Sequence, residues 1–268
     1  MKATQLLREI EKLEAERSAA RAEVAADRVA FARLVGIEPD EWQRRLLGSD
    51  APQVLINCGR QTGKSTIAAV LALHGALISP GALVLILAPA ERQAKELFAK
   101  VTAFYRSLGY PIPADSYRKL GMELKNGSRI EALPGTEKTV RGFSAVDLLI
   151  VDEASRVEDE LYHAVRPMLA VSGGRLMMLS TPFGKRGEFY EAWENGANAW
   201  ERYEVRASEC PRISAEFLAS ERRAMPERVF RQEFLCEFTE TDDQVFSHDL
   251  VMGALTDEVE PLDLQWSW

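Results

Sequence analysis

The stretch VLINCGRQTGKST, at residues 54–66, decides the fold of this chain. The apolar residues at 54–56 predict a buried β-strand, and the pattern at 67–73 predicts a helix. Between them, the segment 59–65 carries two glycines, which let the backbone curl without a side chain in the way. A strand, a glycine-containing loop and a helix in this order are the context of a phosphate-binding loop. We therefore expect an α/β domain with an anion site at the start of the helix.

The last residues of this loop have the chemistry to bind a nucleotide and a metal ion. Gly63, Lys64, Ser65 and Thr66 are expected to direct their backbone amides at phosphate oxygens. The Lys64 side chain can reach the β- and γ-phosphates, and the Ser65 hydroxyl can hold Mg²⁺. The match to the usual motif is incomplete, because Cys58 stands at its first position. The alternative is a Gly-Lys-Ser sequence in an ordinary surface loop.

Composition places the chain among proteins that fold without disulfides. Its 268 residues suffice for one large α/β domain with appendages. The three cysteines show no pairing or metal spacing, which fits a reducing compartment. No apolar run approaches the roughly 20 residues of a membrane span, so we expect no membrane partner. The net charge is −8, but the segment 237–268 alone carries −9, which leaves residues 1–236 near neutral; charge thus neither supports nor excludes DNA binding.

A second motif follows the apolar run at 147–151, which predicts another buried strand. Asp152 and Glu153 come directly after this run. A carboxylate at the carboxyl end of a strand lies in the crevice where α/β sheets bind ligands. We expect Asp152 to hold the Mg²⁺ shared with Ser65, and Glu153 to orient or deprotonate the attacking water. Acidic residues after strands are common, so the phosphate-binding loop upstream gives the pair its meaning.

The rest of the chain reads as alternating strands and helices. Buried strands are predicted at 82–88 and 175–180, with a short strand at 200–205. Asn126-Gly127 predicts a hairpin with a type I′ turn at 120–133, placed as an insertion or at a sheet edge. Residues 2–35 predict one long amphipathic helix that ends at Gly36, and it packs on its own domain or against another chain. Further helices are predicted at 39–47, 91–108, from 188 onward, at 214–224 and at 226–236.

Two other polar pairs are candidates for the same site. Ser180 and Thr181 follow the strand at 175–180 and can sense the γ-phosphate. The alternative is that they only cap a turn before Pro182. Gln43 stands beside Trp42 shortly before the phosphate loop, so the ring can pack while the amide reads the edge of an adenine. The alternative is a surface glutamine beside a core tryptophan.

Four pieces now stand in order, namely Trp42-Gln43, Gly59 to Thr66, Leu148 to Ser155, and Ser180-Thr181-Pro182. This order resembles the N-terminal ATPase domain of the large terminase subunit of tailed bacteriophages, and the resemblance extends from about residue 36 to residue 238. The Arg-Gln pair before Gly-Lys-Ser is similar to the loop variant of that family. The run VRGFS at 140–144 also resembles the family.

The resemblance implies an ATPase that packages double-stranded viral DNA into a preformed capsid. It would work in the host cytoplasm as a homo-oligomeric ring on the portal, with a small terminase subunit as a further partner. The implied fold is α/β, a RecA-like (ASCE-type) P-loop NTPase with a mainly parallel sheet. In this sheet the acidic strand, which precedes Asp152-Glu153, would lie beside the loop strand, which precedes the phosphate-binding loop. The implied division is an N-terminal helix (1–35), an ATPase core (36–186), a small helical lid (187–238) and an acidic linker (239–268) toward a missing nuclease domain.

The resemblance also assigns roles to residues. ATP would contact Gln43 and the loop residues Gly59, Arg60, Gln61, Thr62, Gly63, Lys64, Ser65 and Thr66. Ser65 and Asp152 would bind Mg²⁺, Glu153 would be the catalytic carboxylate, and Ser180 and Thr181 would couple hydrolysis to motion. An arginine finger is expected, because the charge on the γ-phosphoryl group must be neutralised in the transition state.

Two arginines compete for the role of this finger. Arg141 lies in an Arg-Gly turn and could reach the nucleotide of a neighbouring subunit in trans, which is the assignment we favour. Arg60 lies in the loop itself and could act in the same subunit. The alternative for Arg141 is an ordinary solvated arginine.

Other activities are weighed against the motor. The second half of the family's chains is a nuclease, and too little sequence follows residue 237 for such a domain, so we expect no nuclease activity. A helicase-type DNA or RNA translocase would need a second RecA-like domain. A nucleotide-dependent assembly module would need no Glu153. Lys185 and Arg186, in a glycine-flanked loop, are candidates to grip DNA, although basic loops are often simply solvated.

Overall fold

The computed structural model describes residues 27–135, 140, 142–240, 250 and 253–254. Within these residues, eight strands form one sheet in the order β3-β4-β5-β2-β6-β7-β1-β8. The strands are β1 (Gln53–Cys58), β2 (Leu83–Ala88), β3 (Ala114–Arg118), β4 (Gly121–Leu124), β5 (Arg129–Pro134), β6 (Leu148–Asp152), β7 (Arg175–Ser180) and β8 (Glu201–Val205). The neighbours from β5 to β8 pair in parallel, and β4 and β3 add an antiparallel edge.

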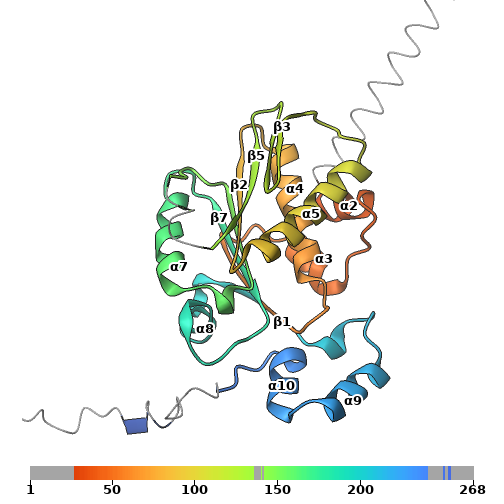
Figure 1. Cartoon of the computed structure of the whole chain (residues 1–268), viewed down its shortest axis with the longest axis vertical. Coiled ribbons are helices and arrows are strands. Elements are labelled where there is room, and N and C mark those ends of the chain that lie inside the picture. The colour runs from red at the N-terminus through yellow and green to blue at the C-terminus, as the bar shows by residue number, and fades with distance from the viewer. Residues whose placement is uncertain (1–26, 136–139, 141, 241–249, 251–252, 255–268) are drawn as a thin grey trace, which may run out of the picture.

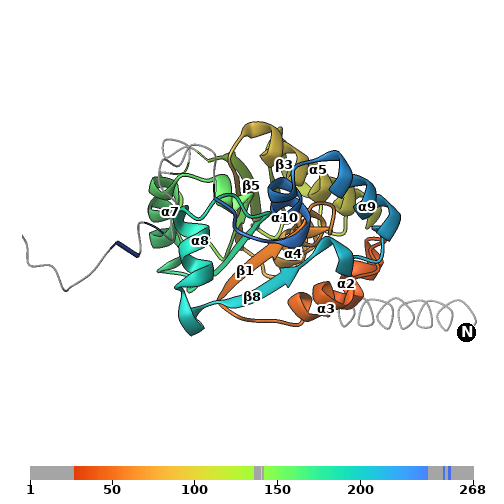
Figure 2. The ribbon, with the colours of Figure 1, turned by 90° about the horizontal axis from the view of Figure 1, so that it is seen from below.

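Helices cover both faces of the sheet and give three layers (Figure 1). One face carries α2 (Arg28–Leu34), α3 (Glu41–Leu47), α4 (Lys64–Ile78) and α5 (Glu91–Ser107), and the other carries α7 (Asp159–Val165) and α8 (Gly187–Glu194). α9 (Ala215–Ala224) and α10 (Glu227–Leu235) lie beyond the carboxyl end of β1, and Figure 2 shows them from below. None of the helices in the described ranges is long and apolar enough to cross a membrane. The sequence did not predict α7 or β3.

Strand side chains alternate between two hydrophobic cores, one on each face of the sheet. Val54 and Ile56 pack in the core beneath α4 and α5, whereas Leu55 packs in the core beneath α7 and α8. All six residues of β2 are buried. Central strands of a parallel sheet are covered on both faces, so they appear in sequence as continuous apolar runs. This is why the sequence identified the central strands and placed them close to their observed bounds.

The order of the strands corrects one prediction. β7 lies between β6 and β1 and pairs with both, so the acidic strand is not beside the loop strand. Parallel strands are joined by long crossovers, and their order is therefore not written in any local pattern. The insertion of β7 has a consequence for the site, because it places Thr181 between the phosphate loop and the acidic residues.

The hairpin between β4 and β5 forms at the edge of the sheet, but its turn differs from the prediction. Gly127 has a φ of +82° and its amide donates to the carbonyl of Leu124 at 2.9 Å. Asn126 has no positive φ, whereas a type I′ turn needs one at both central residues. The loop is instead a tight turn over Lys125 and Asn126, followed by a left-handed glycine, as in three-residue hairpin loops.

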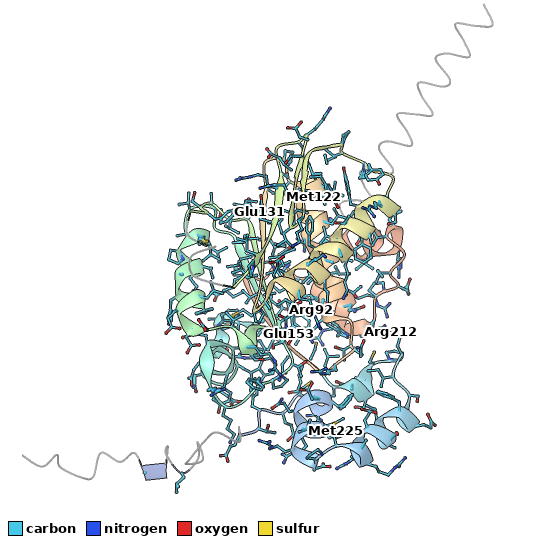
Figure 3. All side chains as sticks on the ribbon, in the orientation of Figure 1. Arg92, Met122, Glu131, Glu153, Arg212 and Met225 are labelled. Carbon is cyan, nitrogen blue, oxygen red and sulfur yellow. The ribbon has the colours of Figure 1, made fainter. Side chains whose placement is uncertain are left out.

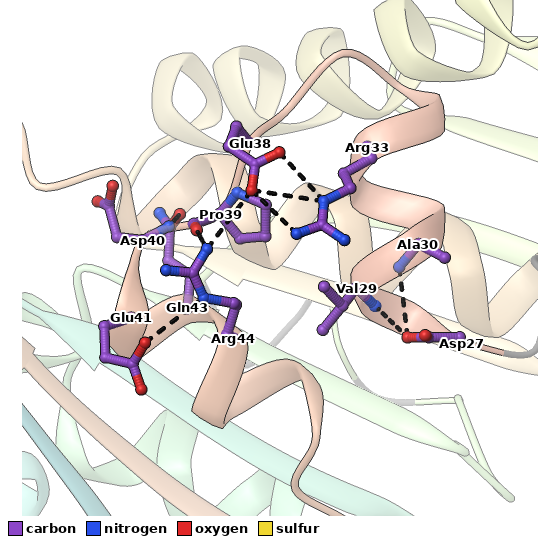
Figure 4. Close-up of polar contacts among 10 residues, drawn as sticks. All are labelled: Asp27, Val29, Ala30, Arg33, Glu38, Pro39, Asp40, Glu41, Gln43 and Arg44. Atoms are coloured by element: carbon purple, nitrogen blue, oxygen red, sulfur yellow. Dashed lines mark hydrogen bonds and ion pairs between the residues drawn. The ribbon is translucent and has the colours of Figure 1, made fainter.

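The predicted helix at 2–35 is not continuous through Asp27. The backbone of Asp27 is extended, and its carboxylate accepts hydrogen bonds from the amides of Val29 at 2.8 Å and Ala30 at 3.3 Å (Figure 4). This side chain therefore starts α2 as a new helix. The part of the predicted helix before Asp27 lies outside the described residues. Gly36, with a φ of +83°, follows α2 in the left-handed conformation that ends helices, as predicted.

The C-terminal part of the described chain divides between the sheet and a small helical unit. β8 falls within the range 187–238 expected for the lid, yet it pairs with β1 along its length and completes the sheet. The 3₁₀ turn Ala207–Glu209, α9 and α10 have a core of their own, formed around Ala207, Phe230 and Phe234. We call residues 207–238 the helical unit.

Candidate functional site

A cavity of about 890 Å³ lies at the carboxyl ends of β1, β6 and β7. It is lined by the loop after β1, by Glu153 after β6, by Thr181 after β7, by α5 and by the helical unit. The carboxyl ends of the strands are where α/β sheets bind ligands. The predicted residues that line it are Arg60, Gln61, Gly63, Lys64, Ser65, Thr66, Glu153 and Thr181. Figure 3 labels Glu153, Arg92 and Arg212, which lie around this region between the sheet and the helical unit.

The loop after β1 has the strained backbone that a tight phosphate-binding turn requires. Gln61 and Gly63 adopt left-handed conformations, with φ of +62° and +93°, and Gly63 is the N-cap of α4. The buried Thr62 hydroxyl donates to the Gly59 carbonyl at 2.9 Å and closes the loop from inside. The Thr66 amide, which we expected to face the ligand, donates in this structure to the Gly63 carbonyl at 3.1 Å in the first helical turn.

Lys64 is the cation at the centre of the site. Its Nζ lies 3.2 Å from Oε1 of Glu153 and donates to Oγ1 of Thr181, also at 3.2 Å. The Lys64 side chain is only 10% exposed, so its charge acts in a medium that screens poorly. The structure thus brings together three residues predicted for the site, from the loop after β1 and from the ends of β6 and β7.

Asp152 lies beside this group and is buried. Its Oδ2 accepts a hydrogen bond from the Ser65 hydroxyl at 3.3 Å. Burial, and then the neighbouring Glu153 carboxylate, raise the pKa of Asp152 to about 6. A buried carboxylate without a full counter-charge, beside a hydroxyl, is a donor set that suits Mg²⁺, which often takes one or two carboxylates and fills its shell with water and phosphate oxygens. The described residues contain no cluster of three or more His, Cys, Asp or Glu that could hold a metal ion by itself.

Replacing Asp152 with Asn is expected to stabilise the protein in the absence of Mg²⁺ and nucleotide. The folded-state pKa of about 6 lies above the ordinary 3.8, so ionisation of Asp152 opposes folding. This penalty is absent well below pH 3.8, grows as the pH rises from 3.8 to about 6, and is complete above that pH. At pH 7 the free energy of unfolding should rise by up to about 3 kcal/mol, and near pH 4 by little. Urea unfolding at both pH values measures it, and an equal change at both would contradict this account.

The two predicted sensor residues have different contacts. Thr181 faces Lys64, but Ser180 is buried and contacts the turn after Glu153 instead. The Ser155 amide donates to Oγ of Ser180 at 3.2 Å, and their hydroxyl oxygens lie 2.6 Å apart. Glu153 itself has a φ of +50°, which is an unfavourable backbone conformation for this residue type. Ser180 therefore helps to fix the strained turn that presents Glu153 to the cavity.

Gln43 lies over the phosphate loop. It is 2% exposed, and its Oε1 accepts a hydrogen bond from the Asp40 amide at 2.9 Å. Its Nε2 lies 2.8 Å from the point that a Cβ on Gly63 would occupy, so a side chain there would displace the Gln43 amide group, and the φ of +93° also favours glycine. Gln43 thus lies beside Gly63 of the loop but is not among the residues lining the cavity, and its role in nucleotide binding stays a prediction.

The sequence did not reveal the contacts that hold the phosphate loop from outside. Asn57 near the end of β1 and three residues of the loop after it are hydrogen-bonded to the segment 205–236. The Asn57 amide group donates to the Cys236 carbonyl at 2.9 Å, the Gly59 amide to the Val205 carbonyl at 2.9 Å, the Arg60 amide to the Glu233 carbonyl at 2.8 Å, and the Arg212 guanidinium to the Thr62 carbonyl at 3.1 Å. The Asn57–Cys236 partners are 179 residues apart, so no local pattern indicates them.

Other basic residues complete the picture. Arg92, Arg156 and Arg212 line the cavity and were not singled out from the sequence. The guanidinium of Arg60 pairs with the Glu233 carboxylate of α10. Arg141 lies outside the described residues.

Lys185 and Arg186 lie in the loop between β7 and α8, and neither lines this cavity. The Arg186 guanidinium lies 5.8 Å from the centre of the Phe183 ring. The suggestion that these two residues grip DNA stays a prediction.

Comparisons with known proteins agree with this geometry. A family model described as "Terminase large subunit, T4likevirus-type, N-terminal" matches residues 55–251. The large terminase subunit of Thermus virus P23-45 is 27% identical over 253 residues, covering 81% of this chain and 52% of the relative. That of Escherichia phage T5 is 25% identical over 193 residues, covering 70% and 44%. The chain thus spans about half the length of the curated relatives it matches.

Solved structures confirm the predicted fold class. The ATPase domain of the Thermus phage P74-26 large terminase matches with a TM-score of 0.70 and 25% identity, over 78% of this chain and 97% of that one. The large terminase of bacteriophage HK97 matches with a TM-score of 0.64 over 75% of this chain and 51% of its own, at 17% identity, which bears on the fold alone. Both are consistent with a RecA-like α/β domain built on a mainly parallel sheet.

Proposed function

Because this chain belongs to the terminase large subunit family, in its T4-like N-terminal form, we propose that it is an ATP-hydrolysing motor domain that drives double-stranded DNA into a viral capsid. The observation that carries the proposal is the contact of Lys64 with both Glu153 and Thr181 at the base of a large cavity. A cation from the phosphate loop, a carboxylate after the acidic strand and a hydroxyl after the next strand are the parts that ATP hydrolysis requires.

The residues of the chain divide the chemistry among themselves. Lys64 and the first amides of α4 bind the phosphates, and Gln43 reads the adenine. Ser65 and Asp152 hold Mg²⁺, which when bound neutralises charge on the phosphate oxygens. Glu153 orients the attacking water and accepts its proton. Glu153 is ion-paired with Lys64 in the free protein. When a phosphate group binds Lys64, it replaces this contact, and the Glu153 carboxylate becomes free to bind the attacking water.

Coupling to motion is assigned to two connections. Thr181 touches Lys64 and lies at the end of β7, so it senses which phosphates are present. The helical unit, which we propose as the lid, is bonded to the phosphate loop through Arg60, Glu233 and Arg212. A change in the loop on hydrolysis is thereby passed to the lid. We place the assembled motor in the host cytoplasm as a homo-oligomeric ring on the portal, with the small terminase subunit as a further partner.

The arginine finger is proposed to be Arg141, acting on the nucleotide of a neighbouring subunit. Arg60 is the weaker choice, since its guanidinium is held by Glu233. We expect Arg141→Ala to abolish the rise of specific ATPase activity with protein concentration, because the finger acts only in an assembly. Steady-state hydrolysis over a wide concentration series, with wild type and variant side by side, measures this effect.

A mixing experiment provides the control for this prediction. Glu153→Ala subunits cannot hydrolyse ATP but still offer Arg141, so they should rescue Arg141→Ala subunits. Donors that carry both substitutions should not rescue. Equal results with the two donors, or activity per subunit that is flat in wild type, would refute the action in trans and leave Arg60 as the residue to test.

The absence of nuclease activity in this polypeptide stays a prediction. Incubation of plasmid DNA with the purified chain and Mg²⁺ or Mn²⁺ tests it, and metal-dependent cleavage would refute it.

A further inference from the structure

Arg212 joins three parts of the molecule that come from distant stretches of the chain. It belongs to the helical unit, in the loop between the 3₁₀ turn Ala207–Glu209 and α9. One nitrogen, Nη1, lies 2.7 Å from Oδ1 of Asp40, the residue before α3. The other, Nη2, donates to the Thr62 carbonyl of the phosphate loop at 3.1 Å. A planar guanidinium can make both contacts at once, which a lysine ammonium on its flexible stem cannot do as well.

The contact with Asp40 leads directly to Gln43. The Asp40 side chain is 12% exposed, against 49% for Arg212, so the carboxylate is the buried partner of this pair. Its second oxygen, Oδ2, is buried and has no hydrogen-bond partner among the described residues. The backbone amide of Asp40 donates to Oε1 of Gln43 (Figure 4). Arg212 therefore holds the residue whose amide holds the Gln43 side chain.

The capping box at the start of α3, in which the Asp40 amide donates to Oε1 of Gln43, decides which way the Gln43 amide group faces, and Arg212 acts on it by holding the Asp40 carboxylate. Since an N–H group can only donate, the Asp40 amide requires the oxygen of Gln43 on its side. The oxygen keeps a second lone pair, and the nitrogen keeps its donors, so the pair matches the N6 and N7 edge of adenine. Guanine carries acceptors at both O6 and N7, so it forms one hydrogen bond with the Gln43 amide group in either orientation, whereas adenine forms two only when the Gln43 oxygen faces N6. The orientation of this one amide thus separates adenine from guanine.

We propose that Arg212 is a positioning residue for base recognition, which acts through Asp40 to hold the Gln43 amide in the orientation that selects adenine. This inference rests on the proposed nucleotide-binding function and adds a residue from the helical unit to it. Gln43 and Arg212 both approach Gly63. A Cβ built on Gly63 would lie 2.8 Å from Nε2 of Gln43 and 3.3 Å from Nη2 of Arg212. Base recognition, the phosphate loop and the helical unit are thereby joined at one residue.

The test is the affinity of the full chain for ATP and GTP, each with Mg²⁺, measured by isothermal titration calorimetry. We expect Arg212→Ala to weaken ATP binding by about tenfold and to narrow the preference for ATP over GTP by a similar factor, because a hydrogen bond to a charged group is lost. Turnover at saturating ATP is measured on the same variant, because a role of Arg212 at the phosphates would lower turnover without changing the ratio of ATP to GTP affinity. Arg212→Lys keeps the charge but loses the planar guanidinium. Its ATP affinity and its preference for ATP over GTP should lie between those of wild type and those of Arg212→Ala.

Asp40→Asn tests the second link, because it removes the charge that Arg212 binds and leaves the backbone amide in place. Asp40→Asn alone should narrow the preference for ATP over GTP as much as Arg212→Ala does. The double variant should differ little from either single variant, because the two residues act through one contact. Arg206→Ala is the matched control. Arg206 lies six residues earlier and makes an exposed ion pair with Glu204 at 2.9 Å, outside the cavity lining. It should leave both affinities unchanged.

Two results would overturn the inference. A lower turnover with an unchanged ratio of ATP to GTP affinity would place Arg212 at the phosphates instead of the base. If the effects of Arg212→Ala and Asp40→Asn on base preference added fully, the two residues would not act through one contact. Wild-type protein that binds no nucleotide would overturn the proposed function as well, and circular dichroism of each variant separates these outcomes from a loss of fold.

Discussion

Glu153→Gln is expected to lower the maximal rate of ATP hydrolysis by about 10²- to 10⁴-fold, the usual contribution of a positioned general base. Glutamine has the size of glutamate and can still orient a water molecule, but it cannot accept the proton. Nucleotide should still bind, because the substitution leaves Lys64, Ser65 and the loop amides in place. Single-turnover hydrolysis and equilibrium binding of ATP, measured on the same preparation, separate the two effects.

The same substitution makes a prediction about Asp152. The Glu153 carboxylate is the second cause, after burial, of the raised pKa of Asp152. Removing its charge should lower that pKa, so the Asp152 carboxylate stays ionised to a lower pH. Glu160, an exposed acid in the first turn of α7, provides the matched control, and Glu160→Gln should leave hydrolysis unchanged. Retention of hydrolysis in Glu153→Gln would remove this residue from the mechanism and favour a nucleotide-binding module without motor activity.

Lys64→Ala is expected to have the largest effect on binding, with an affinity for ATP weaker by at least about 10²-fold and no measurable hydrolysis. The reason is the burial of this charge: truncation of one partner of a buried, hydrogen-bonded charge pair costs 2–5 kcal/mol or more. The side chain is only 10% exposed and contacts Glu153 and Thr181. Arg60, the other cation of the loop, is paired with Glu233. Calorimetric titration with ATP and Mg²⁺ measures the change in affinity.

The control for this prediction is a lysine on the neighbouring helix. Lys95 of α5 is exposed and does not line the cavity, so Lys95→Ala should bind ATP as wild type does. Lys64 also lowers the pKa of Asp152, and its removal should raise that pKa further above 6. ATP binding by Lys64→Ala within a few-fold of wild type would mean that the cavity is not the phosphate site.

The sequence alone determined the local parts of this protein. The strand at 54–58, the left-handed glycine at 63 and the helix after it follow from residue types in one short stretch, because backbone conformation and burial on both faces are local properties. The position of Asp152 and Glu153 at a strand end was readable for the same reason. The order of these motifs also identified the family, which the family model matches over residues 55–251.

The tertiary structure decided what lies next to what. The place of β7 between β6 and β1, the contact of Ser180 with Ser155, and the bonds of the helical unit to the phosphate loop join residues far apart in sequence. Arg212 reaches Thr62 across 150 residues, and nothing in the residues around either one indicates the other. The physical reason is that strand order and docking are set by the packing of whole elements, whereas periodicity and glycine positions report only on the element that contains them.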